Sequence, residues 1–148
     1  MEKTQIRLKK LRSTAVIPTF GSPLSAGADL YACVDADTVI GPGLTVMIPT
    51  GVALEIPTGH VGLVCARSGL STRRGLAPAN KVGVIDADYR GEITVALHNH
   101  GSSAETVAPG ERIAQLLIVP ILSFELTEAD SLSGTERGSG GFGSTGSL

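Results

Sequence analysis

A chain of 148 residues, 42% of them hydrophobic, is long enough to bury a core and too apolar to be disordered, so we expect one globular unit. The net charge of −2 and the pI of about 5.9 exclude the basic surface of a general nucleic-acid binder. No apolar run reaches membrane-spanning length and the start lacks a signal-peptide core, so we expect a cytoplasmic protein with Cys33 and Cys65 as reduced thiols.

Short alternating or apolar runs recur along the chain, and each predicts a β-strand. The expected strands cover residues 6–11, 28–34, 44–48, 52–56, 61–66, 93–97, 113–119 and 122–126. Proline or glycine separates the runs, at positions where a helix could not continue. The pattern predicts an all-β fold, a jelly-roll-like β-barrel or sandwich.

One short helix is expected, beginning at Ser68 and stopped by Gly75 after about two turns. The Ser68 hydroxyl should cap the free amides of its first turn. Amides at a helix N-terminus attract anions, so Arg67, Ser68 and Gly69 are a candidate phosphate cradle, with Arg67 adding a bidentate charge. The alternative is an ordinary capped turn with a surface arginine.

A carboxylate and a phenol lie three residues apart in the segment GVIDADYRG, residues 83–91. Apolar strand-forming runs flank this segment, which predicts a β-hairpin whose tip carries Asp86 and Tyr89. Rigid strands would hold Asp86, a candidate general base, beside the flat ring of Tyr89. The alternative is that Asp86 and Asp88 are ordinary turn residues and Tyr89 packs on the hairpin edge.

Polar side chains also lie within or beside the expected strand at 113–119. Gln115 lies inside the apolar run, so its amide must find a hydrogen-bond partner or face a cavity. Glu111 and Arg112 precede this run, and Arg73-Arg74 ends the helix. Unless they belong to a site, Glu111 and Arg112 form a solvated turn. We expect Arg73-Arg74 to be a solvated helix end, with contact to a substrate as the alternative.

The composition changes at residue 133, after which glycine and serine dominate. We therefore expect residues 1–132 to form the β-barrel domain and residues 133–148 to form a flexible C-terminal segment. Residues 138–143 match the pattern GxGxxG, but only five residues follow, too few for the helix of a dinucleotide-binding fold.

This segment carries an arginine and an aromatic residue, which a simple linker does not need. Arg137 could pair with a polyphosphate and Phe142 could stack on a base. The glycine-rich backbone with Gly143, Ser144 and Thr145 could close over the phosphates. A purely linker role is the alternative.

Taken together, five motifs in order along nearly the whole chain resemble those of the trimeric dUTP pyrophosphatase (dUTPase) family. They are SAGADLY (25–31), ARSGL (66–70), NKVGVIDADYRG (80–91), GERIAQ (110–115) and RGSGGFGSTG (137–146). The chain departs from the family at no position that the family uses for chemistry. The resemblance implies a homotrimer that hydrolyses dUTP to dUMP and pyrophosphate, keeping uracil out of DNA and supplying dUMP for dTTP synthesis.

The resemblance also implies catalytic roles for Asp86, Asp29 and Gln115. Asp86 is the implied base that activates a water for in-line attack on the α-phosphorus, and Asp29 helps to organise the site. Mg²⁺ is implied as the cofactor, held mainly by the triphosphate and waters rather than by protein ligands. His98 and His100 would share one strand face, but no third metal ligand accompanies them.

The remaining implied residues bind the substrate, in sites shared between three subunits. Phosphates are bound by Arg67, Ser68, Gly69 and Gln115. The uracil edge is read by Asn80 and the backbone of Gly83, Val84 and Ile85, and Tyr89 lies against the deoxyribose. A lid that orders over the γ-phosphate and the base is formed by Arg137, Phe142, Gly143, Ser144 and Thr145.

Two other readings stay open. A deaminase of the related dCTP deaminase family would need a glutamate inside the strand after residue 91, where this chain has Ala96. A non-catalytic β trimer that senses a nucleotide or binds a partner is the other, because fold alone does not establish activity.

Overall fold

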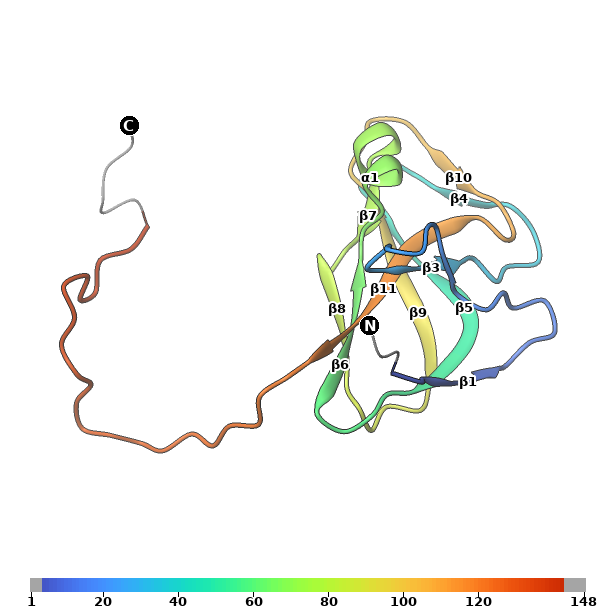
Figure 1. Cartoon of the computed structure of the whole chain (residues 1–148). Coiled ribbons are helices and arrows are strands. Elements are labelled where there is room, and N and C mark those ends of the chain that lie inside the picture. The colour runs from blue at the N-terminus through green and yellow to red at the C-terminus, as the bar shows by residue number, and fades with distance from the viewer. Residues whose placement is uncertain (1–3, 143–148) are drawn as a thin grey trace.

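The computed structural model describes residues 4–142, and within this range eleven β-strands and one helix form (Figure 1). The strands are β1 (Arg7–Lys10), β2 (Thr19–Phe20), β3 (Ala28–Tyr31), β4 (Thr38–Ile40), β5 (Thr45–Glu55), β6 (His60–Cys65), β7 (Leu76–Pro78), β8 (Val82–Ile85), β9 (Glu92–Asn99), β10 (Glu105–Val107) and β11 (Arg112–Pro120). The helix is α1 (Ser68–Arg74). Within this range, no helix is long and apolar enough to cross a membrane.

The strands form a four-stranded sheet in the order β1-β5-β9-β7, a five-stranded sheet in the order β2-β3-β11-β6-β8, and a small pair, β4 with β10. Every pairing is antiparallel. This arrangement confirms the predicted all-β, jelly-roll-like fold with one short helix. The thiols of Cys33 and Cys65 are both free, as expected.

The main hydrophobic core lies between the two large sheets, and Ala15, Cys33 and Val52 form a second, small cluster. Strand β9 alternates strictly between buried and half-buried residues, so Ile93, Val95 and Leu97 point into the core. Ile48 of β5, Leu30 of β3 and other strand residues complete it. Burial of each such side chain stabilises the fold by about 1.5–3 kcal/mol, which fixes the strands that carry the polar groups described below.

The expected strands at 44–48 and 52–56 form a single strand, β5. Pro49 does not end it, because Pro49 lies at a register shift against β9, where a missing ladder N–H is tolerated. Just beyond, the Gly51 N–H donates to Oε1 of Glu92 over 2.7 Å. This irregularity therefore ties β5 to the first residue of β9.

The predicted hairpin around residues 83–91 is wrong. β8 pairs with β6 in the five-stranded sheet, whereas β9 pairs with β5 and β7 in the four-stranded sheet. The turn between β8 and β9 thus crosses from one sheet to the other. The two strands splay apart instead of forming a ladder, and this opens a pocket between them.

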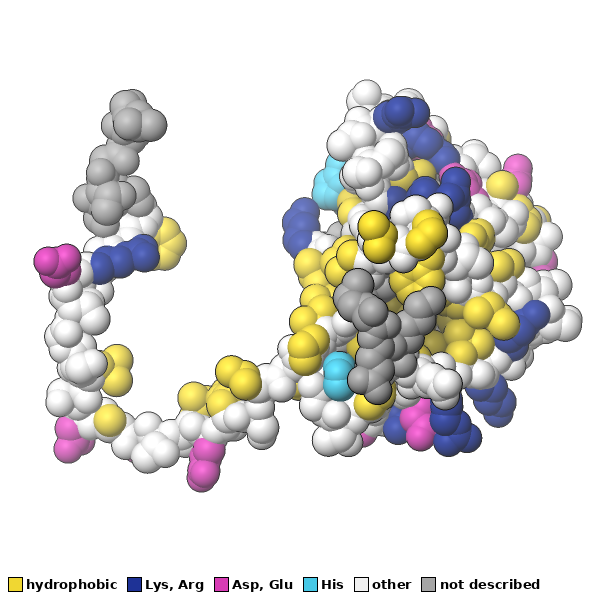
Figure 2. All heavy atoms as spheres, viewed as in Figure 1, with side chains coloured by type: hydrophobic (Ala, Val, Ile, Leu, Met, Phe, Trp, Pro, Cys, Tyr) yellow, Lys and Arg dark blue, Asp and Glu magenta, His cyan; other side chains and the backbone are white. Residues whose placement is uncertain are grey.

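The chain after β11 extends away from the sheets (Figure 1). The expected strand at 122–126 does not form, because no partner strand for it exists within the described residues. Leu122, Phe124 and Leu126 are exposed, and Figure 2 shows hydrophobic side chains along this extended segment. Apolar side chains in this position lack cover from their own chain.

Candidate active site

A pocket of about 430 Å³ lies where β8 and β9 splay apart. Its wall includes the sequence-predicted residues Asn80, Gly83, Val84, Ile85, Asp86 and Tyr89. Met47 of β5 and Glu92, Thr94 and Ala96 of β9 also line it. Of these four, the sequence analysis named only Ala96, as the position where a deaminase would need a glutamate. The fold therefore brings the predicted residues of the segment 80–89 together in one cavity.

One edge of β8 faces away from its partner strand. Within the described residues β8 pairs only with β6, so backbone N–H and C=O groups on its other side have no ladder partner. Unpaired strand edges bind flat or extended ligands through main-chain hydrogen bonds. The Asn80 side chain lies beside this edge, since a Cβ built on Gly83 would be 3.4 Å from its Nδ2 atom. The pocket thus combines an amide with free backbone groups.

The turn after β8 holds Asp86 and Tyr89 close together. The Tyr89 N–H donates to the Asp86 carbonyl over 3.1 Å, closing a tight turn. The Tyr89 hydroxyl donates to the Glu92 carbonyl over 3.0 Å, which fixes the outer end of the ring. The exposed Asp86 carboxylate is therefore open to a water molecule at the pocket mouth.

A second group of predicted residues surrounds Asp29 of β3. Arg67 donates from Nε to Oδ1 of Asp29 over 2.8 Å, and Arg112 donates from Nη1 to Oδ2 over 3.2 Å. The carboxylate is only 14% exposed and thus orients two guanidinium groups at the barrel surface. Arg112, which was expected in solvent, is therefore part of this group. Two cations beside one carboxylate leave a net positive charge at this surface.

Gln115 also belongs to this second group. It lies opposite Asp29 on one side and Cys65 on the other in the ladders of β11. Its Nε2 donates to the Ala66 carbonyl over 2.9 Å, which satisfies the expectation that the amide finds a partner. Gly27 leaves room for the amide, because a Cβ there would lie 2.6 Å from Oε1.

Helix α1 begins at Ser68 as predicted, and Gly75 ends it with a φ of 65°. The expected Ser68 cap is wrong: Arg67 is the N-cap residue, its backbone is extended, and no side chain caps the helix. Ser68 instead accepts, at its carbonyl, the hydroxyl of Thr72 over 2.6 Å. The space around Gly69 is open, so its backbone is accessible.

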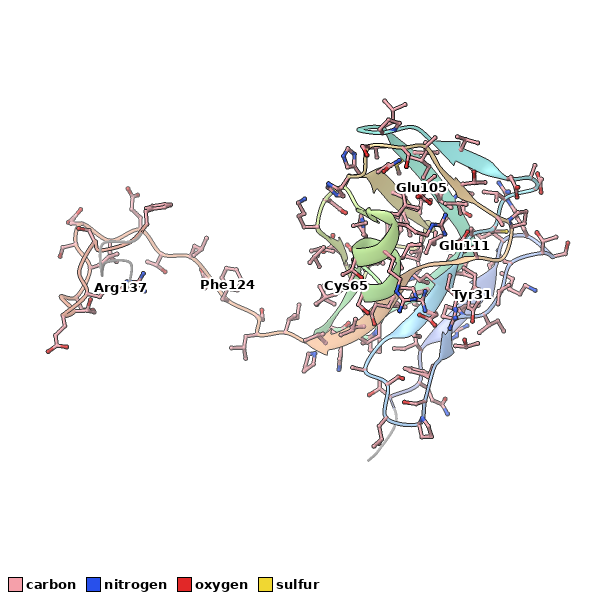
Figure 3. The ribbon with its side chains drawn as sticks, turned by 90° about the horizontal axis from the view of Figure 1, so that it is seen from above. Tyr31, Cys65, Glu105, Glu111, Phe124 and Arg137 are labelled. Carbon is pink, nitrogen blue, oxygen red and sulfur yellow. The ribbon has the colours of Figure 1, made fainter. Side chains whose placement is uncertain are left out.

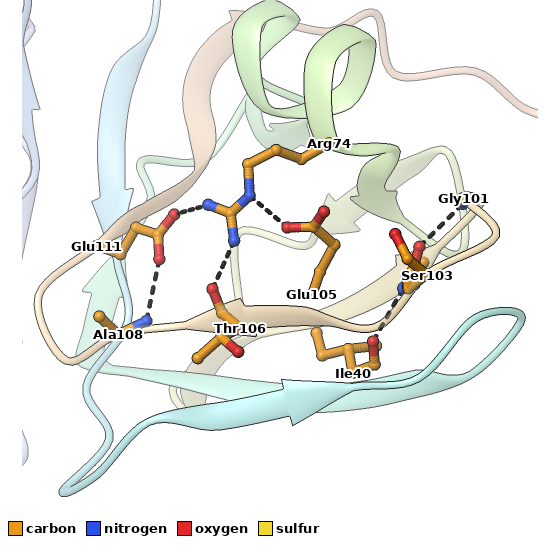
Figure 4. A network of polar contacts seen from close by, with 9 residues as sticks. Ile40, Arg74, Gly101, Ser103, Glu105, Thr106, Ala108 and Glu111 are labelled. Atoms are coloured by element: carbon orange, nitrogen blue, oxygen red, sulfur yellow. Dashed lines mark hydrogen bonds and ion pairs between the residues drawn. The ribbon is translucent and has the colours of Figure 1, made fainter.

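Arg74, at the last position of α1, is bound by acidic side chains rather than solvated (Figure 4). Its guanidinium donates to Oε2 of Glu105 over 2.6 Å, to Glu111 and to the Thr106 carbonyl. Desolvation lowers the pKa of Arg74, but the hydrogen bonds and charges of Glu105 and Glu111 outweigh it and raise that pKa overall. The expectation that Arg74 and Glu111 are solvated is thus wrong.

Within one chain, the pocket residues around Asp86 and the second group around Asp29 lie apart. Ile85 pairs with Gly62, so Asp86 lies near the start of β6, whereas Arg67 follows its other end. From Gly62 to Arg67 the chain advances five residues, about 17 Å at the rise of a strand. Accordingly, Asp29, Arg67 and Gln115 do not line the pocket.

The predicted lid residues lie on the extended C-terminal segment. Figure 3 shows Phe124 and Arg137 well away from Tyr31 and Glu111 on the barrel. Arg137 donates from Nε to the Gly140 carbonyl over 2.8 Å, and Phe142 is exposed. The predictions for Gly143, Ser144 and Thr145 lie outside the described residues.

His98 and His100 lie on one face of the β9 end, as expected, with ring centroids 4.4 Å apart. The His98 Nδ1 also lies 2.9 Å from the Thr45 hydroxyl. Within residues 4–142, no group of three or more histidine, cysteine or acidic side chains is arranged to hold a metal ion.

Fold and site together define an all-β protein with a small-molecule pocket at a free strand edge and a separate cationic surface. The sequence profile of the dUTPase family matches residues 13–146. The chain belongs to the dUTPase family, which confirms the resemblance seen in its motifs.

Individual relatives agree with this assignment. The deoxyuridine 5'-triphosphate nucleotidohydrolase of Syntrophotalea carbinolica is 47% identical over 99% of both chains. The dUTPase of Staphylococcus bacteriophage 80alpha, solved with dUPNHPP, superposes with a TM-score of 0.89 at 31% identity, covering 98% of this chain and 100% of that one. A dUTPase variant from phage phi11 of S. aureus, described with a structural Mg(II) ion, gives a TM-score of 0.78 at 26% identity, covering 86% and 98%.

Proposed function

We propose that this protein hydrolyses dUTP to dUMP and pyrophosphate. The observation that carries the proposal is the pocket of about 430 Å³ in which Asn80, the free edge of β8, Asp86 and Tyr89 meet. Pockets for small molecules typically fall between about 300 and 1,000 Å³ and contain a few convergent polar groups. Family membership, over residues 13–146, identifies the nucleotide.

The free edge of β8 suits recognition of uracil. The base carries one N–H donor between two carbonyl acceptors, a pattern that backbone groups of Gly83, Val84 and Ile85 and the amide of Asn80 can match. A 5-methyl group would have to fit against the same strand, which disfavours dTTP. Tyr89, fixed against the turn, would pack on the deoxyribose and leave no space for a 2′-hydroxyl.

Asp86 would act as the general base. Its carboxylate accepts a proton from a water, and the water oxygen bonds to the α-phosphorus as the bond to the bridging oxygen of the β-phosphate breaks. The two electrons of the broken bond leave with pyrophosphate, and the other product is dUMP. The oxygen and one hydrogen of the water end in dUMP, and its other proton ends on Asp86.

The second group would bind the phosphates. Arg67 and Arg112 are oriented by Asp29, so their remaining N–H donors can receive an anion without a search for the right rotamer. Ser68, the open backbone at Gly69 and the Gln115 amide lie along the same surface. We assign Asp29 to organising the site, and Gln115, with Arg67, Arg112, Ser68 and Gly69, to phosphate binding.

We further propose Mg²⁺ as the cofactor, held by phosphate oxygens and waters. The donor chemistry fits this, since triphosphate oxygens and waters are the ligands that Mg²⁺ prefers and Asp29 is already engaged by two arginines. When bound, the ion neutralises charge on the triphosphate and on the departing pyrophosphate.

The separation of the two groups within one chain supports sites shared between subunits of a homotrimer. The triphosphate of a nucleotide in the pocket would meet Arg67 and Gln115 of a second subunit. The C-terminal segment, which extends away from its own barrel, would supply Arg137, Phe142 and residues 143–145 as a lid from the third. In this proposal residues 1–132 form the barrel domain and residues 133–148 the lid.

One assay tests the function: pyrophosphate release from dUTP, dCTP, dTTP and UTP, with and without Mg²⁺. We expect rapid release from dUTP alone, and only with Mg²⁺. Ammonia release from dCTP would instead identify a deaminase, which is disfavoured because the pocket residue at the position where that family has its glutamate is Ala96. Nucleotide binding without turnover would identify a sensor. A cytoplasmic location, the site of the nucleotide pool, completes the proposal.

A further inference from the structure

Helix α1 has little to hold it in place by itself. It is seven residues long, lacks a side-chain N-cap and an acidic first turn, and buries only Leu70. Isolated helices of this length are unstable in water. The position of α1 on the barrel therefore depends on the burial of Leu70 in the core and on tertiary contacts near the two ends of the helix.

Two ionic bridges supply such contacts, and both reach the start of β11. Just before the helix, Arg67 shares the Asp29 carboxylate with Arg112. At its last residue, Arg74 pairs with Glu111, the neighbour of Arg112. The same two segments, 67–74 and 111–112, are thus joined at both ends of the helix.

The second bridge is itself well anchored (Figure 4). Glu111 uses its other oxygen, Oε2, to accept the Ala108 N–H over 3.0 Å. Arg74 also reaches Glu105 and the Thr106 carbonyl of β10. The planar guanidinium of Arg74 holds its three acceptors in a fixed fork, a geometry that the compact ammonium group of lysine does not reproduce. Through these contacts Arg74 connects α1 to β10 and to the residue that precedes β11.

We propose that Arg74 is a positioning residue for phosphate binding: through Glu111 and Glu105 it holds α1 so that Arg67, Ser68 and Gly69 face the same anion as Gln115. Arg74 does not touch the substrate in this proposal. The inference rests on the proposed function, because the orientation of Arg67, Ser68 and Gly69 matters only if these residues bind the triphosphate. A small shift of such groups is costly, since a misplacement of about 1 Å can reduce a rate about a hundredfold.

The test compares three variants of the full-length protein. Arg74→Gln removes the charge, Arg74→Lys keeps the charge without the planar fork, and Arg73→Gln is the matched control on an exposed neighbour of the same helix and charge. Amide hydrogen exchange is measured at Ser71 and Gly75, whose N–H groups bond within α1. Affinity is measured for two probes, dUPNHPP with Mg²⁺ and deoxyuridine, which has no phosphate.

For Arg74→Gln we expect faster exchange at both amides and an affinity for dUPNHPP about tenfold weaker, the size of one lost charge-assisted hydrogen bond. Deoxyuridine should bind within about twofold of wild type, because the pocket lies elsewhere. Arg74→Lys should recover part of the loss, and Arg73→Gln should match wild type in every measurement.

If Arg74→Gln weakened the affinity for both probes equally, Arg74 would contribute only to the stability of the fold, and the proposal would be overturned. An unchanged affinity for dUPNHPP would overturn it as well. If Arg74→Gln does not fold, Glu105→Gln, which removes the negative charge of one partner and keeps Glu111, serves in its place with the same expectations. A wild-type protein that binds dUPNHPP but releases no pyrophosphate from dUTP would refute the proposed function and leave the role of Arg74 in phosphate binding standing.

Discussion

The ring of Tyr89 lies so close over Gly91 that a Cβ atom at position 91 would be 2.6 Å from Cζ of the tyrosine. Real Cβ atoms essentially never approach another heavy atom so closely, so only glycine permits this ring position. The hydroxyl is held at the same time by the Glu92 carbonyl. One wall of the pocket is therefore set by a residue without a side chain.

The first prediction concerns the discrimination between dUTP and UTP. Gly91→Ala should push the Tyr89 ring out of place and, like Tyr89→Ala, raise kcat/KM for UTP relative to dUTP, because the barrier to a 2′-hydroxyl is lost. Tyr89→Phe, which keeps the ring and loses only the bond to Glu92, should retain most of the discrimination. If UTP stays as poor a substrate for both alanine variants as for wild type, the sugar is selected elsewhere.

A second prediction isolates the base. Asp86→Asn preserves shape and cannot accept a proton from water, so kcat should fall at least about a hundredfold while dUPNHPP still binds. Asp88→Asn is the control, because Asp88 is an exposed carboxylate two residues away that lines a different cavity. Near-normal turnover of the Asp86 variant would remove it as the base.

Site sharing makes a third prediction, on mixed assemblies. A chain that ends after Gly134 should fold with unchanged stability, because the last strand ends at Pro120, and should lose most activity. Co-refolded in equal amounts with Asp86→Asn, it should recover about a quarter of wild-type sites, those that take Asp86 from one parent and the lid from the other.

Two controls accompany this mixing experiment. Sedimentation must give the mass of a trimer, and each parent refolded alone must stay nearly inactive. Activity that never exceeds the sum of the parents would place the whole site in one chain. Phe142→Ala should show part of the loss, since stacking on a base contributes about 1–3 kcal/mol.

The fourth prediction is a pH dependence at His100. Desolvation and the neighbouring charges of His98 and Lys81 lower the pKa of His100 from its ordinary value of 6.5. Below that ordinary value the unfolded chain binds a proton that the folded protein resists, so the free energy of unfolding falls as the pH drops through this range. His100→Gln should flatten this part of the curve, as measured by urea unfolding at several pH values.

NMR titration of His100 gives an independent check. Lys81→Asn should raise the pKa of His100 towards its ordinary value, because it removes a positive charge. Asparagine suits the site, since Lys81 has a φ of 66° and asparagine adopts this left-handed conformation readily. A titration curve that is identical in the variant and the wild type would contradict this account.

Features that depend on neighbouring residues could be predicted from the sequence. The alternation of Ile93, Val95 and Leu97 predicts the buried face of β9, and Gly75 predicts the end of α1. Both follow from local physics, since a strand repeats every two residues and glycine has access to positive φ. The pocket residues Asn80, Asp86 and Tyr89 could also be predicted from the sequence, because they lie on one short segment.

Only the tertiary structure decided which segments meet. The runs around residues 83–91 have hairpin character, yet β8 pairs with β6, and the pocket exists because of that choice. Arg74 and Glu111 are 37 residues apart, and neither has a local signal that distinguishes an ion pair from a solvated charge. Strand pairing and charge pairing between distant segments depend on how the whole core packs, since local preferences are weak beside the burial of a complete sheet face.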